Sequence, residues 1–292
     1  MNPLTQCKKI PILPLLIALA LVVVAAAGAA RAAMSDFNGD GHLDYVLQNL
    51  NTRQTAIWYL NNNVFLSGRD GPTIPAGWSL VDVADFDGDG HPDYVLEGPN
   101  NRTAIWYLNN NVFTRGAYGP TLPSGWLLGA VGDFNGDGKP DYLLYKPGSN
   151  FPTPTPTTIW YMNNNVHVAS ASGPTLPSGW GLIGVEDFNG DGKPDFLLFD
   201  FSSAKTAIWY LSGATFTRGV FGPTLAAGYI LQGTADFNRD GHPDYVLENF
   251  NTHQTAIWYL NNNVFTRGAY GPTLPPGWYL VAPFAGLSPW DY

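Results

Sequence analysis

Short apolar runs separated by polar turns repeat along the chain from residue 34 onward. The final unit shows four such runs: Asp244–Leu247, Thr255–Leu260, Val264–Arg267 and Gly277–Val281. They are rich in aromatic and branched residues, which is typical of β-strands. Asn261–Asn263 and Gly271-Pro272 separate the later runs and predict turns. No segment has a sustained helical period, so the pattern predicts an all-β protein.

An acidic loop opens each unit and sets the period of the chain. The five copies begin at Asp36, Asp85, Asp133, Asp187 and Asp236, at spacings of 49, 48, 54 and 49 residues. A period of about 50 residues with four strands per unit is typical of propeller blades. We therefore expect a β-propeller with five four-stranded blades.

The two ends of the repeat region indicate how the ring closes. No strand equivalent to Leu80–Ala84 precedes the first loop, whereas the last unit is followed by a surplus run, Tyr279–Val281. Pro283 then stands where a sixth loop would begin. We expect the C-terminal strand to complete the first blade and leave a closed ring with no free edge.

Each acidic loop has oxygen-bearing side chains at positions 1, 3, 5 and 9 and Gly at position 6. Gly permits a bend with positive φ, and oxygen donors that converge on one point suit Ca²⁺. A main-chain carbonyl at position 7 adds a further donor. The predicted ligands of up to five Ca²⁺ ions are Asp36, Asn38, Asp40, His42, Asp44; Asp85, Asp87, Asp89, His91, Asp93; Asp133, Asn135, Asp137, Lys139, Asp141; Asp187, Asn189, Asp191, Lys193, Asp195; and Asp236, Asn238, Asp240, His242, Asp244.

Three other interpretations of the loops compete with calcium binding in a β-hairpin. A polar turn needs no metal, but 16 of the 23 acidic residues lie at ligand positions, where like charges repel without a cation. An EF-hand needs a Glu at position 12 and flanking helices, and a dockerin-like loop also expects a helix. Position 12 is always leucine, within a predicted strand. In the fifth loop, Arg239 replaces a glycine, which we expect to perturb that site.

Residues 1–33 have the pattern of a secretory signal peptide. Lys8 and Lys9 precede an apolar run from Ile10 to Ala30, followed by an A-x-A cleavage motif. The alternative is an uncleaved anchor, because the run approaches the ~20 residues that span a bilayer. With cleavage, residues 34–292 form a propeller without a membrane span, secreted or held at the cell surface. The formal net charge is −9, and no basic stripe predicts nucleic-acid binding.

The five loops resemble those of the FG-GAP-like or VCBS repeat proteins, which carry a D-x-[DN]-x-D-G-x-x-D loop between two blade strands. The resemblance extends over Ser35 to Val281. The same loop type occurs in the integrin α-subunit propeller, which usually has seven blades rather than five. The resemblance implies an extracellular, calcium-loaded propeller used for adhesion or recognition, and it names no ligand.

Two aromatic series recur once per unit. Trp58, Trp106, Trp160, Trp209 and Trp258 form the first, which we expect to pack between blades. Trp78, Trp126, Trp180, Tyr229 and Trp278 form the second, beside a turn, where packing competes with a role in ligand binding. No Ser or Cys nucleophile lies in a supporting motif, so an enzyme is not expected.

We expect a monomeric recognition or structural module whose partner is an extracellular protein or glycan. A multivalent lectin is the first alternative, and a polysaccharide-acting enzyme is the second. Strand parity places the calcium loops and Asn turns on one face, with the variable connections opposite. Recognition usually uses variable loops, and the candidate ligand-binding residues there are Arg53, Arg102, Lys205 and His253 with Trp78, Trp126, Trp180 and Trp278.

Overall fold

A computed structural model describes residues 35–148 and 153–283. The predicted signal peptide, residues 1–33, lies outside this part of the chain. Within the described ranges, no helix has the length and apolar character needed to cross a membrane. The helical content there includes one 3-10 turn, η1 (Pro99–Asn101).

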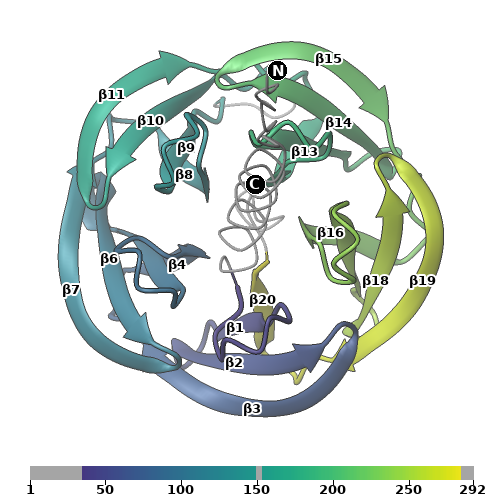
Figure 1. Ribbon diagram of the computed structural model, residues 1–292, viewed down its shortest axis with the longest axis horizontal. Coiled ribbons are helices and arrows are strands. Elements are labelled where there is room, and N and C mark those ends of the chain that lie inside the picture. Colours follow the sequence, from purple (N-terminus) through teal and green to yellow (C-terminus); the bar gives the residue numbers. More distant parts are fainter. Residues whose placement is uncertain (1–34, 149–152, 284–292) are drawn as a thin grey trace, which may run out of the picture.

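The described chain folds into five sheets of four antiparallel strands, arranged around a ring (Figure 1). The first blade contains β20 (Trp278–Ala282), β1 (Tyr45–Asn49), β2 (Gln54–Asn61) and β3 (Val64–Thr73). The second contains β4 (Ser79–Ala84), β5 (Asp93–Gly98), β6 (Arg102–Asn109) and β7 (Val112–Thr121). The third contains β8 (Leu127–Gly132), β9 (Asp141–Tyr145), β10 (Thr157–Asn163) and β11 (Val166–Ser172).

The last two blades have the same order from the centre of the ring outward. The fourth contains β12 (Trp180–Glu186), β13 (Asp195–Asp200), β14 (Lys205–Ser212) and β15 (Thr215–Phe221). The fifth contains β16 (Tyr229–Ala235), β17 (Asp244–Asn249), β18 (Gln254–Asn261) and β19 (Val264–Thr273). The predicted fold class, a five-bladed β-propeller with four-stranded blades, is confirmed.

The C-terminal strand closes the ring, as the surplus run after the last unit predicts. β20 pairs antiparallel with β1, with Leu280 opposite Leu47 and Tyr279 opposite Gln48. Blade 1 is therefore built from two segments far apart in sequence, and Figure 1 shows β20 beside β1.

The expectation that closure leaves no free edge is wrong in one respect. Each sheet still ends in an outermost strand, β3, β7, β11, β15 or β19, at the circumference of the ring (Figure 1). In four junctions the third residue of an Asn triplet covers part of this edge, because its side-chain amide donates to a carbonyl of the preceding blade's outer strand. These bonds are Asn63 to Tyr270, Asn111 to Asp70, Asn165 to Tyr118 and Asn263 to Phe221, at 2.8–3.0 Å.

Three outer strands are longer than the turn signals predict. β3, β7 and β19 each run for 10 residues, through the Gly-Pro pair that was expected to end them. Proline is tolerated here because the missing N–H lies on an edge strand. The Pro carbonyl is used as well, since Thr55 Oγ1 donates to the Pro72 carbonyl at 2.7 Å.

The third unit carries a Pro-rich insertion, Phe151–Thr157, whose prolines predict a stiff exposed loop. Its C-terminal end is anchored rather than free. Residues 151–152 lie outside the described chain, but Thr155 exchanges two backbone hydrogen bonds with Leu176. Thr157, predicted as the last residue of an exposed loop, is buried and begins β10. The carbonyl of Thr155 accepts the N–H of Leu176, as the carbonyl of Asn101 accepts the N–H of Leu122 in the second unit.

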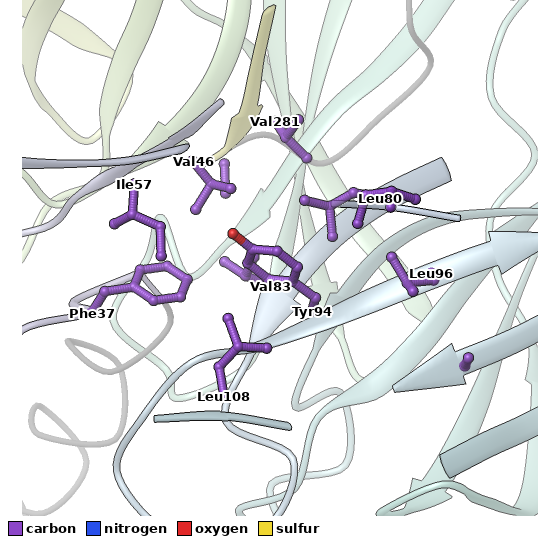
Figure 2. Packing of buried hydrophobic residues seen from close by; sticks show 12 residues of the cluster. Phe37, Val46, Ile57, Leu80, Val83, Tyr94, Leu96, Leu108 and Val281 are labelled. Carbon is purple, nitrogen blue, oxygen red and sulfur yellow. The ribbon is translucent and has the colours of Figure 1, made fainter. Parts of the chain in front are cut away.

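The hydrophobic core lies between blades rather than within them. Figure 2 shows one of five clusters, in which Phe37, Val46 and Ile57 of the first blade meet Tyr94 and Leu108 of the second. The other four clusters join the remaining neighbouring pairs in the same way. The inner strands of each sheet are therefore largely buried on both faces, whereas the outer strand is mostly exposed, and each blade depends on its two neighbours.

The first tryptophan series packs against these clusters, as predicted. Trp58, for example, is partly buried against the cluster between the first and fifth blades. Its indole lies beside Gly68, where a Cβ would come within 2.9 Å of the ring, and meets Phe65 edge-on at 4.9 Å. The glycine of the outer strand thus makes room for the tryptophan of the strand next to it.

Candidate metal-binding loops

In the second to fifth blades the acidic loop joins the first and second strands, and in the first blade it leads into β1. The second loop, for instance, begins directly after Ala84 at the end of β4 and ends at Asp93, the first residue of β5. Every one of the five loops leads into a strand. The EF-hand and dockerin-like alternatives require a helix there and are excluded.

The carboxylate at position 1 organises the bend of each loop. In the first loop, Asp36 accepts the N–H of Gly39 at 2.8 Å and the N–H of Gly41 at 2.7 Å. Gly41 has φ +83°, and the four equivalent glycines have φ between +84° and +88°. Only glycine adopts this conformation readily, so the predicted bend is confirmed.

Three carboxylates converge in the second loop. Asp85, Asp87 and Asp89 each offer an oxygen, and these oxygens lie within 4.8 Å of one another. The other loops have Asn at position 3, so an amide oxygen replaces one carboxylate. Clustered carboxylate and amide oxygens are the donor set of a hard divalent cation such as Ca²⁺.

The aspartate at position 9 ties the loop to the third strand of its blade. In the second loop, Asp93 Oδ2 accepts the N–H of Phe86 at 3.0 Å, and Oδ1 accepts the N–H of Leu108 at 3.0 Å. All five copies are buried and make the same pair of bonds: Asp44, Asp93, Asp141, Asp195 and Asp244. Each carboxylate oxygen retains a second lone pair for a metal.

Burial makes these position-9 carboxylates hard to ionise without a cation. Desolvation, with smaller contributions from the charges of Asp87 and Asp85, raises the pKa of Asp93 from 3.8 to about 7. The backbone donors oppose the shift but do not cancel it. The pKa of Asp44, Asp141, Asp195 and Asp244 is raised to about 7 as well, chiefly by burial. A bound divalent cation would favour the ionised form.

Family comparison agrees with this geometry. A model of the FG-GAP-like repeat matches residues 36–96, 85–144 and 187–247, which is more than half of the 292 residues. The chain belongs to the FG-GAP-like repeat family. No curated protein matches the sequence.

Solved structures resemble the chain only distantly. A functionally unknown protein from Desulfotomaculum acetoxidans is 13% identical, with a TM-score of 0.39, over 80% of this chain and 67% of that one. The Dos1 propeller is 9% identical, with a TM-score of 0.37, over 74% of this chain and 65% of that one. Chaetomium thermophilum Raptor is 12% identical, with a TM-score of 0.41, over 78% of this chain and 20% of that one.

The FG-GAP-like loops also lock neighbouring blades together. Phe37, at position 2 of the first loop, meets Tyr94 of the second blade edge-on at 6.2 Å. Equivalent aromatic contacts join the loop to the following blade at three more junctions: Phe86 to Tyr142, Phe134 to Phe196 and Phe237 to Tyr45. A change in loop conformation therefore alters the aromatic packing at the blade junction.

Position 7 differs between the FG-GAP-like loops in its side chain but not in its backbone. Its N–H donates to the position-5 carboxylate in all five, as His42 does to Asp40 at 2.7 Å. The lysines reach the turn of their own blade: Lys139 Nζ donates to Asn163 at 2.8 Å and Lys193 Nζ to Ser212 at 3.0 Å. The loops and Asn turns are thus neighbours, as strand parity predicts.

Arg239 reaches out of its own loop to the first loop. Its Nη2 donates to the backbone carbonyl of Asp40 in the first loop, at 3.3 Å. The guanidinium covers Gly41 so closely that a Cβ there would lie 2.3 Å from Nη2. Arg239 therefore links the fifth and first loops across the seam where β20 closes the ring.

The four candidate basic residues at the opposite connections do not form one equivalent set. Arg53 and His253 have φ of +63° and +57° and precede a strand, whereas Arg102 and Lys205 are the first residues of β6 and β14. His253 is also engaged within the chain, because its Nδ1 lies 2.8 Å from the buried Glu248 carboxylate. The set therefore divides into two matching pairs, Arg53 with His253 and Arg102 with Lys205.

The second aromatic series is half-buried rather than freely exposed. Trp78, Trp126, Trp180 and Trp278 each pack against an inter-blade cluster. Trp78 lies on Gly98 and comes within 6.2 Å of the Tyr118 ring, while Trp180 lies 6.3 Å from the Phe221 ring. Tyr118 and Phe221 could not be predicted as neighbours of these tryptophans, because the predicted outer strand ends before them.

Proposed function

We propose that this chain is a secreted calcium-binding propeller that serves as an adhesion, recognition or structural module. Each FG-GAP-like loop holds one Ca²⁺ through positions 1, 3, 5 and 9 and the carbonyl of position 7. The family fold and the repeated loops support a binding or structural module. Secretion rests on the signal-peptide pattern of residues 1–33.

The observation that carries calcium binding is the convergence of Asp85, Asp87 and Asp89 within 4.8 Å. Three carboxylates at this separation repel one another strongly unless a cation lies between them. Their loop is shaped beforehand, since Asp85 already accepts the N–H groups of Gly88 and Gly90. A preformed loop loses little conformational entropy when it binds metal.

Calcium in this position would stabilise the ring as well as the loop. The position-9 carboxylate and the position-2 Phe connect each loop to the third strand and to the next blade. Metal that binds only the native state raises the free energy of unfolding. With the millimolar affinities usual for extracellular modules, millimolar Ca²⁺ contributes about 0.4–1.4 kcal/mol per loop.

A lectin is the second candidate, and exposed aromatic rings favour it. Tyr118 and Tyr270 are 63% and 70% exposed on the outer strands of two blades. Exposed rings on a rigid scaffold stack on the apolar faces of sugars, because both surfaces lose water on contact. The five metal loops would then act as the scaffold that holds these rings in place.

Metal counting on the purified propeller tests the calcium proposal. Equilibrium dialysis followed by elemental analysis should give up to five Ca²⁺ per chain, and Asp89→Ala should lower the count by about one. Asp87→Asn is the matched control, because it reproduces the Asn found in the other four loops and should keep its ion. A protein that binds no calcium at millimolar concentration, or melts at the same temperature in excess chelator, would refute the proposal.

A further inference from the structure

The second blade carries a cluster of aromatic and basic side chains that the metal loops do not use. Trp78 precedes β4, Arg102 begins β6 and Tyr118 lies on β7, so the cluster spans the blade from its inner to its outer strand. Pairing of Gly98 with Arg102, and of Ala104 with Tyr118, places the basic and aromatic residues on one face of the sheet. We call Trp78, Arg102 and Tyr118 the blade-2 platform.

Contacts within the platform hold its rings in a fixed relation. The Trp78 and Tyr118 rings are 6.2 Å apart and only 32° from parallel. The Arg102 guanidinium lies 4.3 Å from the centre of the Tyr118 ring. Gly98 allows this arrangement, because a Cβ there would lie 2.4 Å from the indole. The backbone of Tyr118 is held as well, since its carbonyl accepts a hydrogen bond from the side-chain amide of Asn165 in the third blade at 2.9 Å.

The platform keeps free binding capacity on its surface. Tyr118 is 63% exposed although it touches two other side chains. Arg102 is exposed, and none of the described residues forms an ion pair with it. Stacking uses the face of a guanidinium and leaves its N–H donors, which lie in the plane, available for a carboxylate. The acidic neighbour Glu97 accepts the N–H of Leu128 in the third blade at 2.9 Å.

We propose that the blade-2 platform binds the carboxylated sugar residues of an acidic polysaccharide. Tyr118 would stack on the apolar face of a sugar ring, and Arg102 would donate two parallel hydrogen bonds to the carboxylate. The chemistry of Arg102 favours an acidic ligand, because its exposed guanidinium presents planar N–H donors that match a carboxylate. This inference rests on the proposed role as a recognition module and gives it a ligand class and a place.

Other blades show what the platform requires. The fifth blade has Tyr270 at the position of Tyr118, 70% exposed, but Gln254 replaces Arg102 and donates to the Gly271 carbonyl at 2.8 Å. The fourth blade has Phe221 and Lys205, but Lys205 pairs in register with Asp200, an acidic residue. The second blade alone, among the five, combines an exposed tyrosine with an arginine at the matching position.

Titration calorimetry with an oligosaccharide of galacturonate residues tests the proposal. The native protein should bind it, and binding should weaken as salt is added. Tyr118→Ala and Arg102→Ser should each weaken binding about tenfold, whereas Tyr118→Phe should retain it. Reducing the carboxylates of the oligosaccharide to alcohols should weaken its binding to native protein. The loss of affinity should be at least as large as the loss caused by Arg102→Ser with the acidic oligosaccharide.

Tyr270→Ala is the matched control, because it removes an equally exposed ring without an arginine and should leave binding unchanged. Three outcomes would each overturn the proposal. They are no binding of the oligosaccharide to native protein, a loss of affinity in Tyr270→Ala equal to that in Tyr118→Ala, and tighter binding of a glutamate-rich peptide of the same charge. Calcium counts on the same samples separate the two proposals. Loss of calcium binding with sugar binding intact refutes only the metal sites, and the reverse refutes only the platform.

Discussion

The acidic loops lie at one end of each blade, here called the loop end, and the variable connections lie at the opposite end. The backbone repeats at both ends, but the side chains repeat at only one. At the loop end, side chains and hydrogen bonds are nearly identical in all five blades. At the opposite end the backbone still repeats, since Arg53, Asn101, Ala204 and His253 all have positive φ. Their side chains, however, range from a methyl group to a guanidinium. The five repeats therefore share a backbone conformation at both ends, but they share side-chain chemistry only at the loop end.

The reason lies in what the side chains contact. Loop carboxylates such as Asp36 and Asp93 accept backbone N–H groups, so the fold itself depends on them. Side chains such as Tyr118 and Arg102 are exposed and contribute little to the core. Substitution at the loop end should therefore reduce stability, and substitution at the opposite end should alter binding. Variable residues on a rigid scaffold are where recognition is usually found.

The largest effect is expected from a position-9 aspartate. Asp93→Ala leaves the N–H groups of Phe86 and Leu108 without an acceptor in a buried environment. Each unsatisfied donor costs about 1–3 kcal/mol, so the free energy of unfolding should fall by about 2–6 kcal/mol. Urea denaturation in excess chelator measures this without any contribution from metal.

Asp89→Ala is the comparison for that measurement. Asp89 is exposed and accepts the N–H of His91, also in an exposed position. In chelator it should be far less destabilising than Asp93→Ala, although both remove a proposed metal ligand. Equal destabilisation of the two variants would mean that position 9 acts only through the metal.

Sequence alone predicted the blade number, ring closure and the glycine bend of the acidic loops, because each depends on repeated local patterns. It did not reveal the second role of Asp93, which depends on the N–H of Leu108, fifteen residues away on another strand. It grouped Arg53 with Arg102, although the two differ in backbone conformation and in register. Tyr118 was missed because a Gly-Pro pair predicts a turn, whereas an edge strand accommodates proline.

An intermediate effect is expected from an inner strand that departs from the repeat. Asp82 on β4 is buried at a register position held in the other blades by Ala130, Gly184, Gly233 and Ala282. It accepts the N–H of Val131 from the third blade at 3.0 Å. Burial raises the pKa of Asp82 from 3.8 to about 8, and the charge of Glu186 adds to the shift.

The sign of the resulting pH dependence follows from proton binding. Between pH 3.8 and about 8 the folded protein holds this proton more tightly than the unfolded chain does. The free energy of unfolding should therefore fall as pH rises through this window, by up to about 1.4 kcal/mol per unit. Asp82→Asn should remove that part of the slope in urea denaturation with calcium in excess. A difference between native protein and variant that stays constant from pH 5 to 8 would contradict it.

The smallest effect is expected at Arg239, where the loop end departs from its own pattern. Position 4 is glycine in the other four loops, and Arg239 holds the same left-handed conformation at φ +60°. Its guanidinium lies against the backbone of the first loop. A unit charge about 8 Å from a divalent ion in water raises the binding free energy by roughly 1 kcal/mol before screening by salt. Arg239→Gly should therefore tighten calcium binding by the first loop about two- to fivefold at low salt. Arg239→Lys, which keeps the charge, should not.

Calorimetric calcium titration checks this, with Asp40→Ala added to remove the first site. If the gain survives in that double variant, the guanidinium acts on some other loop.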